Sequence, residues 1–165
     1  MIEKGNGKNT RGNSGPIQYT TFFVGDALLG LDISFVQEIN RNMVLTRVPH
    51  GPPSVRGVMN LRGEVVTMLD LRYLLGLPKG ESTVHNRNVI VKCDGELVGV
   101  WVDRVADILT IQGSDITPPP SNLSGLQARF VRGVYQQPES LVMIVDPREI
   151  LQASLAGTGT NRSVA

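Results

Sequence analysis

An internal repeat constrains the fold of this chain more than any other feature of its sequence. The tetrapeptide Val-Arg-Gly-Val at 55–58 recurs 76 residues later, at 131–134. With the same shift and no gap, Asp70 falls on Asp146, and the apolar run that precedes each aspartate is matched as well. A four-residue match alone could arise by chance, but an ordered block of matching apolar positions is harder to dismiss. The chain is therefore predicted to contain two related units.

A second block of the repeat lies upstream, in a different register. A shift of 69 residues pairs Gly30 with Gly99, and four further pairs of similar residues follow: Ile33 with Val102, Val36 with Val105, Glu38 with Asp107 and Ile39 with Ile108. The two shifts differ by seven residues, so the second copy carries extra chain, for which the Pro-rich stretch at 116–127 is the obvious place. Each unit is too small to bury much surface alone, so the two are expected to pack together.

Short apolar or alternating runs recur along the chain between Gly, Asp and Pro residues that favour turns. Many short strands with frequent turns predict a mainly β fold, built as small barrels or as a sandwich. Two short helices are predicted where an aspartate takes the N-cap position, at Asp70 and at Asp146, the second being followed by Pro147. The predicted strands are 19–24, 28–31, 44–48, 58–61, 65–69, 89–91, 97–102, 108–111, 131–135 and 141–145.

The composition limits the classes of protein that remain. At 165 residues the chain is one ordinary domain or two very small ones, and its formal net charge of +1 gives no reason to expect a polyanionic partner. Cys93 is the only cysteine and cannot form an internal disulfide. No apolar run approaches the ~20 residues that cross a bilayer, and the first 15 residues lack the apolar centre of a signal peptide. We therefore expect a cytoplasmic protein.

Residue patterns that carry chemistry are missing from the sequence. His50 and His85 stand far apart without metal-ligand spacing, so no metal site is expected. There is no Gly-x-Ser-x-Gly elbow and no Gly-rich phosphate loop, so neither a catalytic nucleophile nor a bound cofactor is expected. Aromatic residues make up only 5 % and do not interleave with a basic stripe, which argues against nucleic-acid binding. The sequence therefore favours a protein that functions through a docking surface rather than through an active site.

Arg62 is the strongest candidate for such a surface. The first copy of the repeat has Asn-Leu-Arg-Gly at 60–63, whereas the second has Gln-Gln-Pro-Glu at 136–139. A residue required only to build the fold should tend to recur in both copies, and Arg62 does not. The alternative is a solvated arginine beside a tight Arg-Gly turn, and the sequence alone leaves both interpretations open.

The chain resembles the CheW-type chemotaxis coupling proteins over about residues 17 to 155. The turn Asn-Leu-Arg-Gly after Gly-Val-Met, followed by an apolar strand and Asp-Leu-Arg, is fairly specific for that family. Thr67 stands where relatives often have proline, a modest departure for an edge position. The segments that carry the resemblance are Thr21–Ile39, Arg47–Leu77, Leu97–Leu109, the Pro-rich loop Pro118–Pro120 and Phe130–Leu151.

The resemblance implies a definite architecture and a definite role. The fold would be two tandem SH3-like five-stranded β-barrels packed on each other, with short capping helices. The first barrel would span about 16–84 plus a C-terminal helix at 146–155, and the second about 85–145, within one domain at 16–155. Flexible tails would occupy 1–15 and 156–165. The protein would be a non-catalytic adaptor that links the cytoplasmic tips of methyl-accepting chemoreceptors to the regulatory domain of a CheA-type histidine kinase.

Two sets of candidate docking residues follow from the residues and the resemblance. The receptor-binding set is Val36, Glu38, Ile39, Asn60, Leu61 and Arg62, in which Glu38 and Arg62 are expected to form an ion pair. The kinase-binding set is Met43, Leu45, Arg47, Val48, Arg56 and Gly57. The protein would be cytoplasmic and recruited to membrane receptor arrays. The alternatives are a scaffold of a twitching or other non-swimming receptor–kinase pathway and, from a different class, a small β-barrel module that binds nucleic acid.

Overall fold

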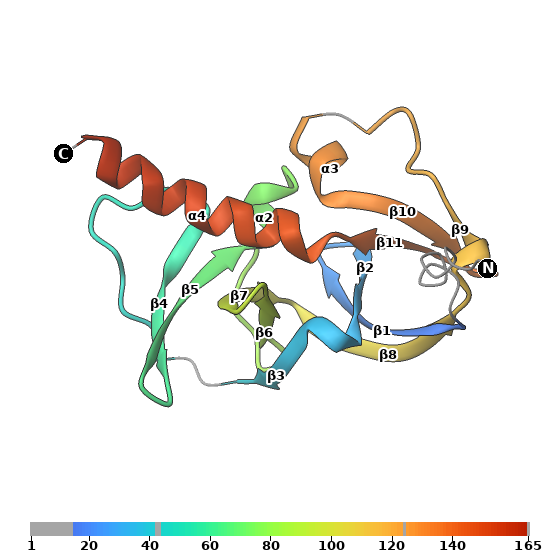
Figure 1. The fold of residues 1–165 in the computed structure, drawn as a ribbon, viewed down its shortest axis with the longest axis horizontal. Helices are drawn as coiled ribbons and strands as arrows, with labels where there is room; N and C mark the ends of the chain where they lie inside the picture. Colours follow the sequence, from blue (N-terminus) through green and yellow to red (C-terminus); the bar gives the residue numbers. More distant parts are fainter. Residues whose placement is uncertain (1–14, 42–43, 124, 165) are drawn as a thin grey trace, which may run out of the picture.

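The computed structural model describes residues 15–41, 44–123 and 125–164, and most of its elements are strands (Figure 1). The strands are β1 (Ile17–Val24), β2 (Ala27–Asp32), β3 (Val36–Asn40), β4 (Val55–Leu61), β5 (Glu64–Asp70), β6 (Arg87–Cys93), β7 (Glu96–Val102), β8 (Arg104–Ile111), β9 (Ile116–Thr117), β10 (Val131–Gln136) and β11 (Leu141–Val145). The helices are α2 (Leu71–Leu74), α3 (Gly125–Phe130) and α4 (Pro147–Val164), with 3₁₀ turns at Ile33–Phe35 and Gly113–Asp115. The predicted mainly β class is confirmed.

The strands form two sheets that repeat one arrangement. One sheet has the order β8-β1-β2-β11-β10-β9, and the other has the order β3-β6-β7-β5-β4. In each, a single parallel pair joins two antiparallel parts, β2 with β11 and β7 with β5. Gly30 lies opposite Ile144 in the first sheet, and Gly99 lies opposite Met68 in the second. These are the residues that the two shifts of the sequence repeat make equivalent, so the repeat holds at the level of strand register.

Two other repeated glycines allow a third piece of chain to reach each sheet. A Cβ atom on Gly57 would lie 2.6 Å from the carbonyl oxygen of Thr46, and one on Gly133 would lie 3.0 Å from that of Thr117. Thr46 pairs with Val58 through two hydrogen bonds of 2.8 and 2.9 Å, and Thr117 in β9 occupies the matching place beside β10. A side chain at Gly57 would clash with the backbone of Thr46, and one at Gly133 would be crowded by the backbone of Thr117 and the side chain of Ile116.

The sheet pairing differs from the division predicted near residue 84. β1 and β2, from the first repeat copy, lie in the six-stranded sheet with β8 to β11 of the second copy. β6 and β7, from the second copy, lie in the five-stranded sheet with β3, β4 and β5 of the first. Each copy thus lends two strands to the other. A sequence repeat shows which segments are equivalent. It does not show whether a strand pairs within its own copy or with the other copy, because both arrangements give the same alternation of apolar and polar residues.

Both predicted N-caps are present and equivalent. Asp70 accepts a hydrogen bond from the backbone N–H of Arg72 at 2.9 Å, and Asp146 accepts one from Arg148 at 2.9 Å. α4 continues to Val164, beyond the 146–155 predicted, so residues 156–164 are helical where a flexible tail was expected. The two glycines of that stretch do not end the helix, because each costs a helix only about 0.5–1 kcal/mol. The predicted N-terminal tail at 1–15 lies almost wholly outside the described residues.

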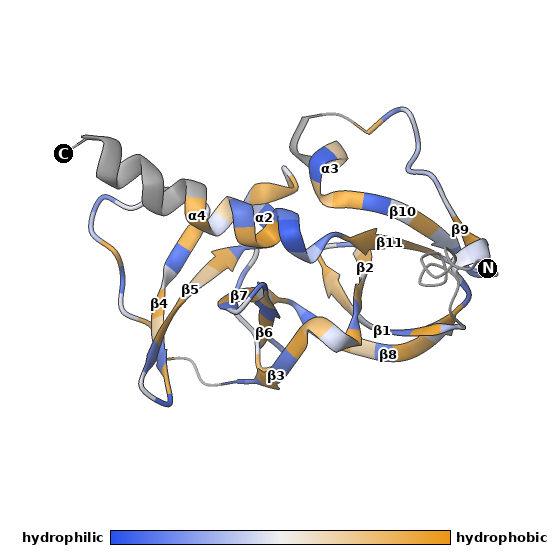
Figure 2. Ribbon diagram, viewed as in Figure 1, coloured by the Kyte–Doolittle hydropathy of each residue, from blue (hydrophilic) through white to orange (hydrophobic). Residues whose placement is uncertain are grey.

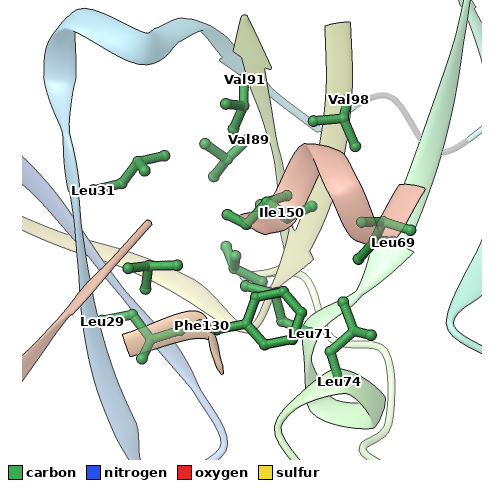
Figure 3. Close-up of a cluster of buried hydrophobic side chains, with 14 of the residues drawn as sticks. Leu29, Leu31, Leu69, Leu71, Leu74, Val89, Val91, Val98, Phe130 and Ile150 are labelled. Atoms are coloured by element: carbon green, nitrogen blue, oxygen red, sulfur yellow. The ribbon is translucent and has the colours of Figure 1, made fainter. Parts of the chain in front are cut away.

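A shared apolar core joins the two sheets. Figure 3 shows Leu31 of β2 facing Val89 and Val91 of β6, Leu29 beside Phe130, and Ile150 of α4 in the middle of the cluster. α4 leaves the six-stranded sheet after β11 and crosses to the other sheet (Figure 1). Each sheet also has a smaller core of its own: Met59, Leu61, Val66, Met68 and Ile90 in the five-stranded sheet, and Tyr19, Ile111, Val142 and Ile144 in the other.

Apolar residues from the strands of both sheets fill these cores. Residues Val66, Leu69, Val100, Val102, Val142 and Ile144 are all buried. Val58 is only partly buried, because it alternates along β4 with Gly57 and Met59, which face inward. Hydrophobic and hydrophilic residues alternate along strands such as β10 (Figure 2), as expected when one face of a strand meets the core.

Candidate docking site at the edge of the five-stranded sheet

The hairpin turn that carries Arg62 has an unusual backbone. Leu61 pairs with Glu64, so Arg62 and Gly63 form a two-residue loop, and both have positive φ angles, of 51° and 91°. The side chain of Asn60 supports the turn by accepting a hydrogen bond from the N–H of Gly63 at 2.9 Å. Such turns favour Asn, Asp or Gly at the first of the two central positions. Arg62 is therefore not the residue that the turn itself would select.

Arg62 forms an ion pair with a residue at the opposite edge of its own sheet. Its Nη1 atom lies 2.7 Å from Oε1 of Glu38, as the sequence predicted. Glu38 belongs to β3 and Arg62 follows β4, and these two strands are the outer strands of the five-stranded sheet. The sheet therefore curls until its edges approach each other, and the ion pair bridges them (Figure 1).

Glu38 is held by more than the arginine. Its Oε2 atom accepts a hydrogen bond from Nδ2 of Asn40 at 2.7 Å, and Oδ1 of Asn40 accepts one from Asn88 at 3.3 Å. The hydrogen bond from Asn40, followed by the one from Arg62, lowers the pKa of Glu38 below its ordinary value. The carboxylate is therefore kept charged and fixed in orientation. The Arg62 side chain remains 71 % exposed, so its other donors face solvent.

The remaining residues of the predicted receptor-binding set are not all at the surface. Ile39 is 38 % exposed and Val36 is partly buried, but Leu61 points into the core of its own sheet. Val65, which was not predicted, is 71 % exposed and lies opposite Asn60 at the same end of the hairpin. Alternation could have found it, because Val65 and Val66 are neighbours in a strand and only one of them can face the core.

The kinase-binding set lies at the other end of β4. Its residues Leu45, Arg47, Val48 and Arg56 line a groove of about 1080 Å³, whereas Gly57 is buried and Met43 lies outside the described residues. The groove is completed by Pro49, His50, Gly51, Pro52, Pro53, Val55, Asp70, Tyr73, Leu77 and Lys79. The structure thus brings most of this set together on one surface. Arg56 lies six residues before Arg62 in the chain, which is about 20 Å at 3.4 Å per residue, whereas Leu45 packs against the core cluster that contains Leu61.

The described residues contain no sign of a metal centre. No group of three or more His, Cys, Asp or Glu side chains among them could hold a metal ion. In the same part of the chain, no helix is long and apolar enough to span a membrane.

Comparison with known proteins identifies the family. The family model for the CheW-like domain matches residues 18–155. The chain belongs to the CheW family. It is 35 % identical to the chemotaxis protein CheW of Rhizobium meliloti, over 81 % of this chain and 86 % of the relative, and 32 % identical to CheW of Helicobacter pylori, over 88 % of each. The crystal structure of the scaffolding protein TtCheW from Thermoanaerobacter tengcongensis superposes with a TM-score of 0.74 at 29 % identity, covering 79 % of this chain and 89 % of that one.

Family membership also gives the general function. The protein is a non-catalytic adaptor of chemotaxis signalling that couples chemoreceptors to a CheA-type kinase. The expected resemblance, fold class and absence of enzymatic activity are thereby confirmed. What the family does not give is the surface of this chain that contacts each partner.

Proposed function

We propose that this member of the CheW family binds its two partners on two separate surfaces of the five-stranded sheet. The receptor edge consists of Val36, Glu38, Ile39, Asn60, Leu61 and Arg62 and receives the helical tip of a chemoreceptor. The kinase face consists of Met43, Leu45, Arg47, Val48, Arg56 and Gly57 and docks the regulatory domain of the kinase. The adaptor would act in the cytoplasm, where the receptor tips recruit it to membrane arrays.

The observation that carries the assignment of the receptor edge is the Arg62–Glu38 ion pair. It fixes two charges where the sheet edges meet, beside the exposed side chains of Ile39 and Val65. A helix that lies against such a surface is held by apolar anchors, while charges at the rim set its register. The second repeat copy has Pro138 in place of Arg62 and Asp107 in place of Glu38, so it lacks the pair. The proposal therefore concerns one sheet only.

The test measures binding of charge-reversal variants to a receptor cytoplasmic fragment and to the kinase regulatory domain. Arg62→Glu places two carboxylates beside each other at the receptor edge, which should weaken receptor binding about tenfold or more at low salt. Because the kinase face lies at the other end of β4, binding of the kinase domain should change little. Adding Glu38→Arg restores opposite signs and should recover part of the receptor affinity.

The matched control is Arg129→Glu. Arg129 also forms a surface ion pair at 2.7 Å, with Glu149, but between α3 and α4. This variant should bind both partners as the wild type does. Wild-type receptor affinity of Arg62→Glu, or an equal loss in the control, would exclude the receptor edge and leave Arg62 as a solvated turn residue.

A further inference from the structure

The groove on the kinase face carries an excess of positive charge. Three cationic side chains line it, those of Arg47, Arg56 and Lys79, against the single carboxylate of Asp70. The formal net charge of the whole chain is only +1, so this concentration is local. Like charges gathered in one concave surface repel each other, and a ligand of opposite charge relieves that repulsion.

In the described part of the chain, no carboxylate forms an ion pair with a cation of the groove. Arg47 and Lys79 are exposed, and neither forms an ion pair with any described residue. The carboxylate of Asp70 is already used as the N-cap of α2, where it accepts a hydrogen bond from the N–H of Arg72. The groove therefore presents its positive charge to whatever enters it.

Arg56 is held rigidly in the wall of the groove. Its guanidinium lies over the ring of Trp101, with 4.1 Å between its carbon and the ring centroid, and Trp101 is itself buried. The Nε atom of Arg56 is buried and has no hydrogen-bond partner in the described structure. A stacked guanidinium is oriented in advance, so little conformational entropy is lost when it binds a carboxylate. The guanidinium of Arg56 is thus oriented before any partner binds.

The chain segment before β4 forms a preformed wall. The N–H of Gly51 donates to the carbonyl of Val48 at 3.0 Å, and the N–H of Val55 donates to that of Pro52 at 3.0 Å. These are successive tight turns, and prolines among the lining residues restrict the backbone further. A rigid wall makes the groove present before any partner arrives. Tyr73, 48 % exposed, adds an apolar surface across from this wall.

We propose that the groove binds an acidic segment of the kinase regulatory domain. Carboxylates of that segment pair with Arg47, Arg56 and Lys79, and an apolar side chain between them packs against Tyr73. This inference rests on the proposed function, because it adds the chemistry of the partner to the face assigned to the kinase. It also predicts that the contact is electrostatic and therefore weakened by salt.

The experiment measures the affinity of the full chain for the kinase regulatory domain in several salt concentrations. Lys79→Glu and Arg47→Glu change exposed residues and should leave the fold intact. Each should weaken binding about tenfold or more at low salt, and the loss should shrink as salt is added. Arg132→Glu is the matched control, because Arg132 is exposed, occupies the position of Arg56 in the second repeat copy and does not line the groove.

The outcomes separate this inference from the function on which it rests. If the wild-type chain does not bind the regulatory domain at all, the assignment of the kinase face fails. If the wild-type chain binds the regulatory domain and both variants bind it as tightly as the wild type does, kinase docking stands and the acidic-segment proposal is overturned. An equal loss in Arg132→Glu would also overturn it, because binding would then follow net charge. Light scattering tests whether a second copy of this chain occupies the groove instead. If the chain self-associates, and Lys79→Glu abolishes this self-association but leaves kinase binding unchanged, the proposal is overturned.

Discussion

Arg72 and Asp103 tie the two sheets together through one shared carboxylate oxygen. Nη2 of Arg72 lies 2.6 Å from Oδ2 of Asp103, and the same oxygen accepts a hydrogen bond from the N–H of Gly25 at 2.6 Å. Arg72 belongs to α2, which follows the five-stranded sheet, whereas Gly25 lies in the turn between β1 and β2 of the other sheet. Both charged side chains are largely buried, so solvent screens them little.

Removing the arginine should therefore destabilise the protein. Arg72→Ala leaves the carboxylate of Asp103 partly buried without its cation, and hydrogen bonds to charged groups contribute about 1.5–3 kcal/mol. We expect a loss of about 2 kcal/mol in the free energy of unfolding, measured with urea. Arg148→Ala is the control, because Arg148 is the equivalent residue of the second repeat and is exposed; it should cost less than about 0.5 kcal/mol. Equal losses would show that the contact contributes nothing specific.

The core of the five-stranded sheet gives a second prediction. Met68 is fully buried beneath β7, whereas Val65, three residues earlier in the same strand, is 71 % exposed. Met68→Ala should lower the free energy of unfolding by about 2–5 kcal/mol, and Val65→Ala should change it by less than about 0.5 kcal/mol. Thermal melts distinguish the two. An unchanged midpoint for Met68→Ala would mean that the cavity collapses without cost.

How much of this fold the sequence predicted depends on the range of each interaction. Each N-cap hydrogen bond, at Asp70 and at Asp146, joins residues two apart in the chain, so the aspartates themselves were enough to predict both caps. The equivalence of Gly30 and Gly99 was found because both copies keep a glycine there, where side chains of the adjacent strand, those of Val142 and Met68, crowd the place of a Cβ atom. The exchange of strands between the copies was not found, since it depends on which of two equivalent partners a strand meets.

The docking residues divide in a similar way. The failure of the turn to repeat pointed to Arg62, but its contact with Glu38 was predicted from the residues together with the family resemblance. The contact of Arg72 with Asp103 was missed because nothing in sequence joins residues 31 apart across two sheets. The charge of the groove was missed for the same reason. Lys79 reaches it from beyond α2, and only the folded chain brings it near Arg47 and Arg56.

The third prediction concerns Gly57, which was proposed for the kinase face. A Cβ atom there would lie 2.6 Å from the carbonyl oxygen of Thr46, so Gly57→Ala must displace the segment that leads into the groove. We expect a loss of about 1–3 kcal/mol from overpacking. Gly113→Ala is the control, since nothing lies within 4 Å of the new methyl group. If Gly57→Ala melts like the wild type, the backbone of Thr46 has room to move.

The last prediction concerns the charge of Glu38. The hydrogen bond from Asn40 is the largest cause of its lowered pKa, ahead of the one from Arg62, although Asn40 is neutral. Asn40→Ala should therefore raise the pKa of Glu38, and Arg62→Gln, which removes the charge of the arginine, should raise it as well. Both shifts can be followed by the NMR titration of the side-chain carboxyl. The control is Asn122→Ala, which changes an exposed asparagine in the connection between β9 and α3 and should leave the pKa of Glu38 unaltered.

The direction of the lowered pKa also fixes its effect on stability. Because the folded state binds the proton of Glu38 less tightly than the unfolded state does, the contribution is complete above the unfolded pKa of about 4.3. It is lost as the pH falls through the lower pKa of the folded state. The stability difference between the wild type and Asn40→Ala should thus be constant near neutral pH and shrink in acid. A difference that grows on acidification would show that Asn40 stabilises the protonated carboxyl instead.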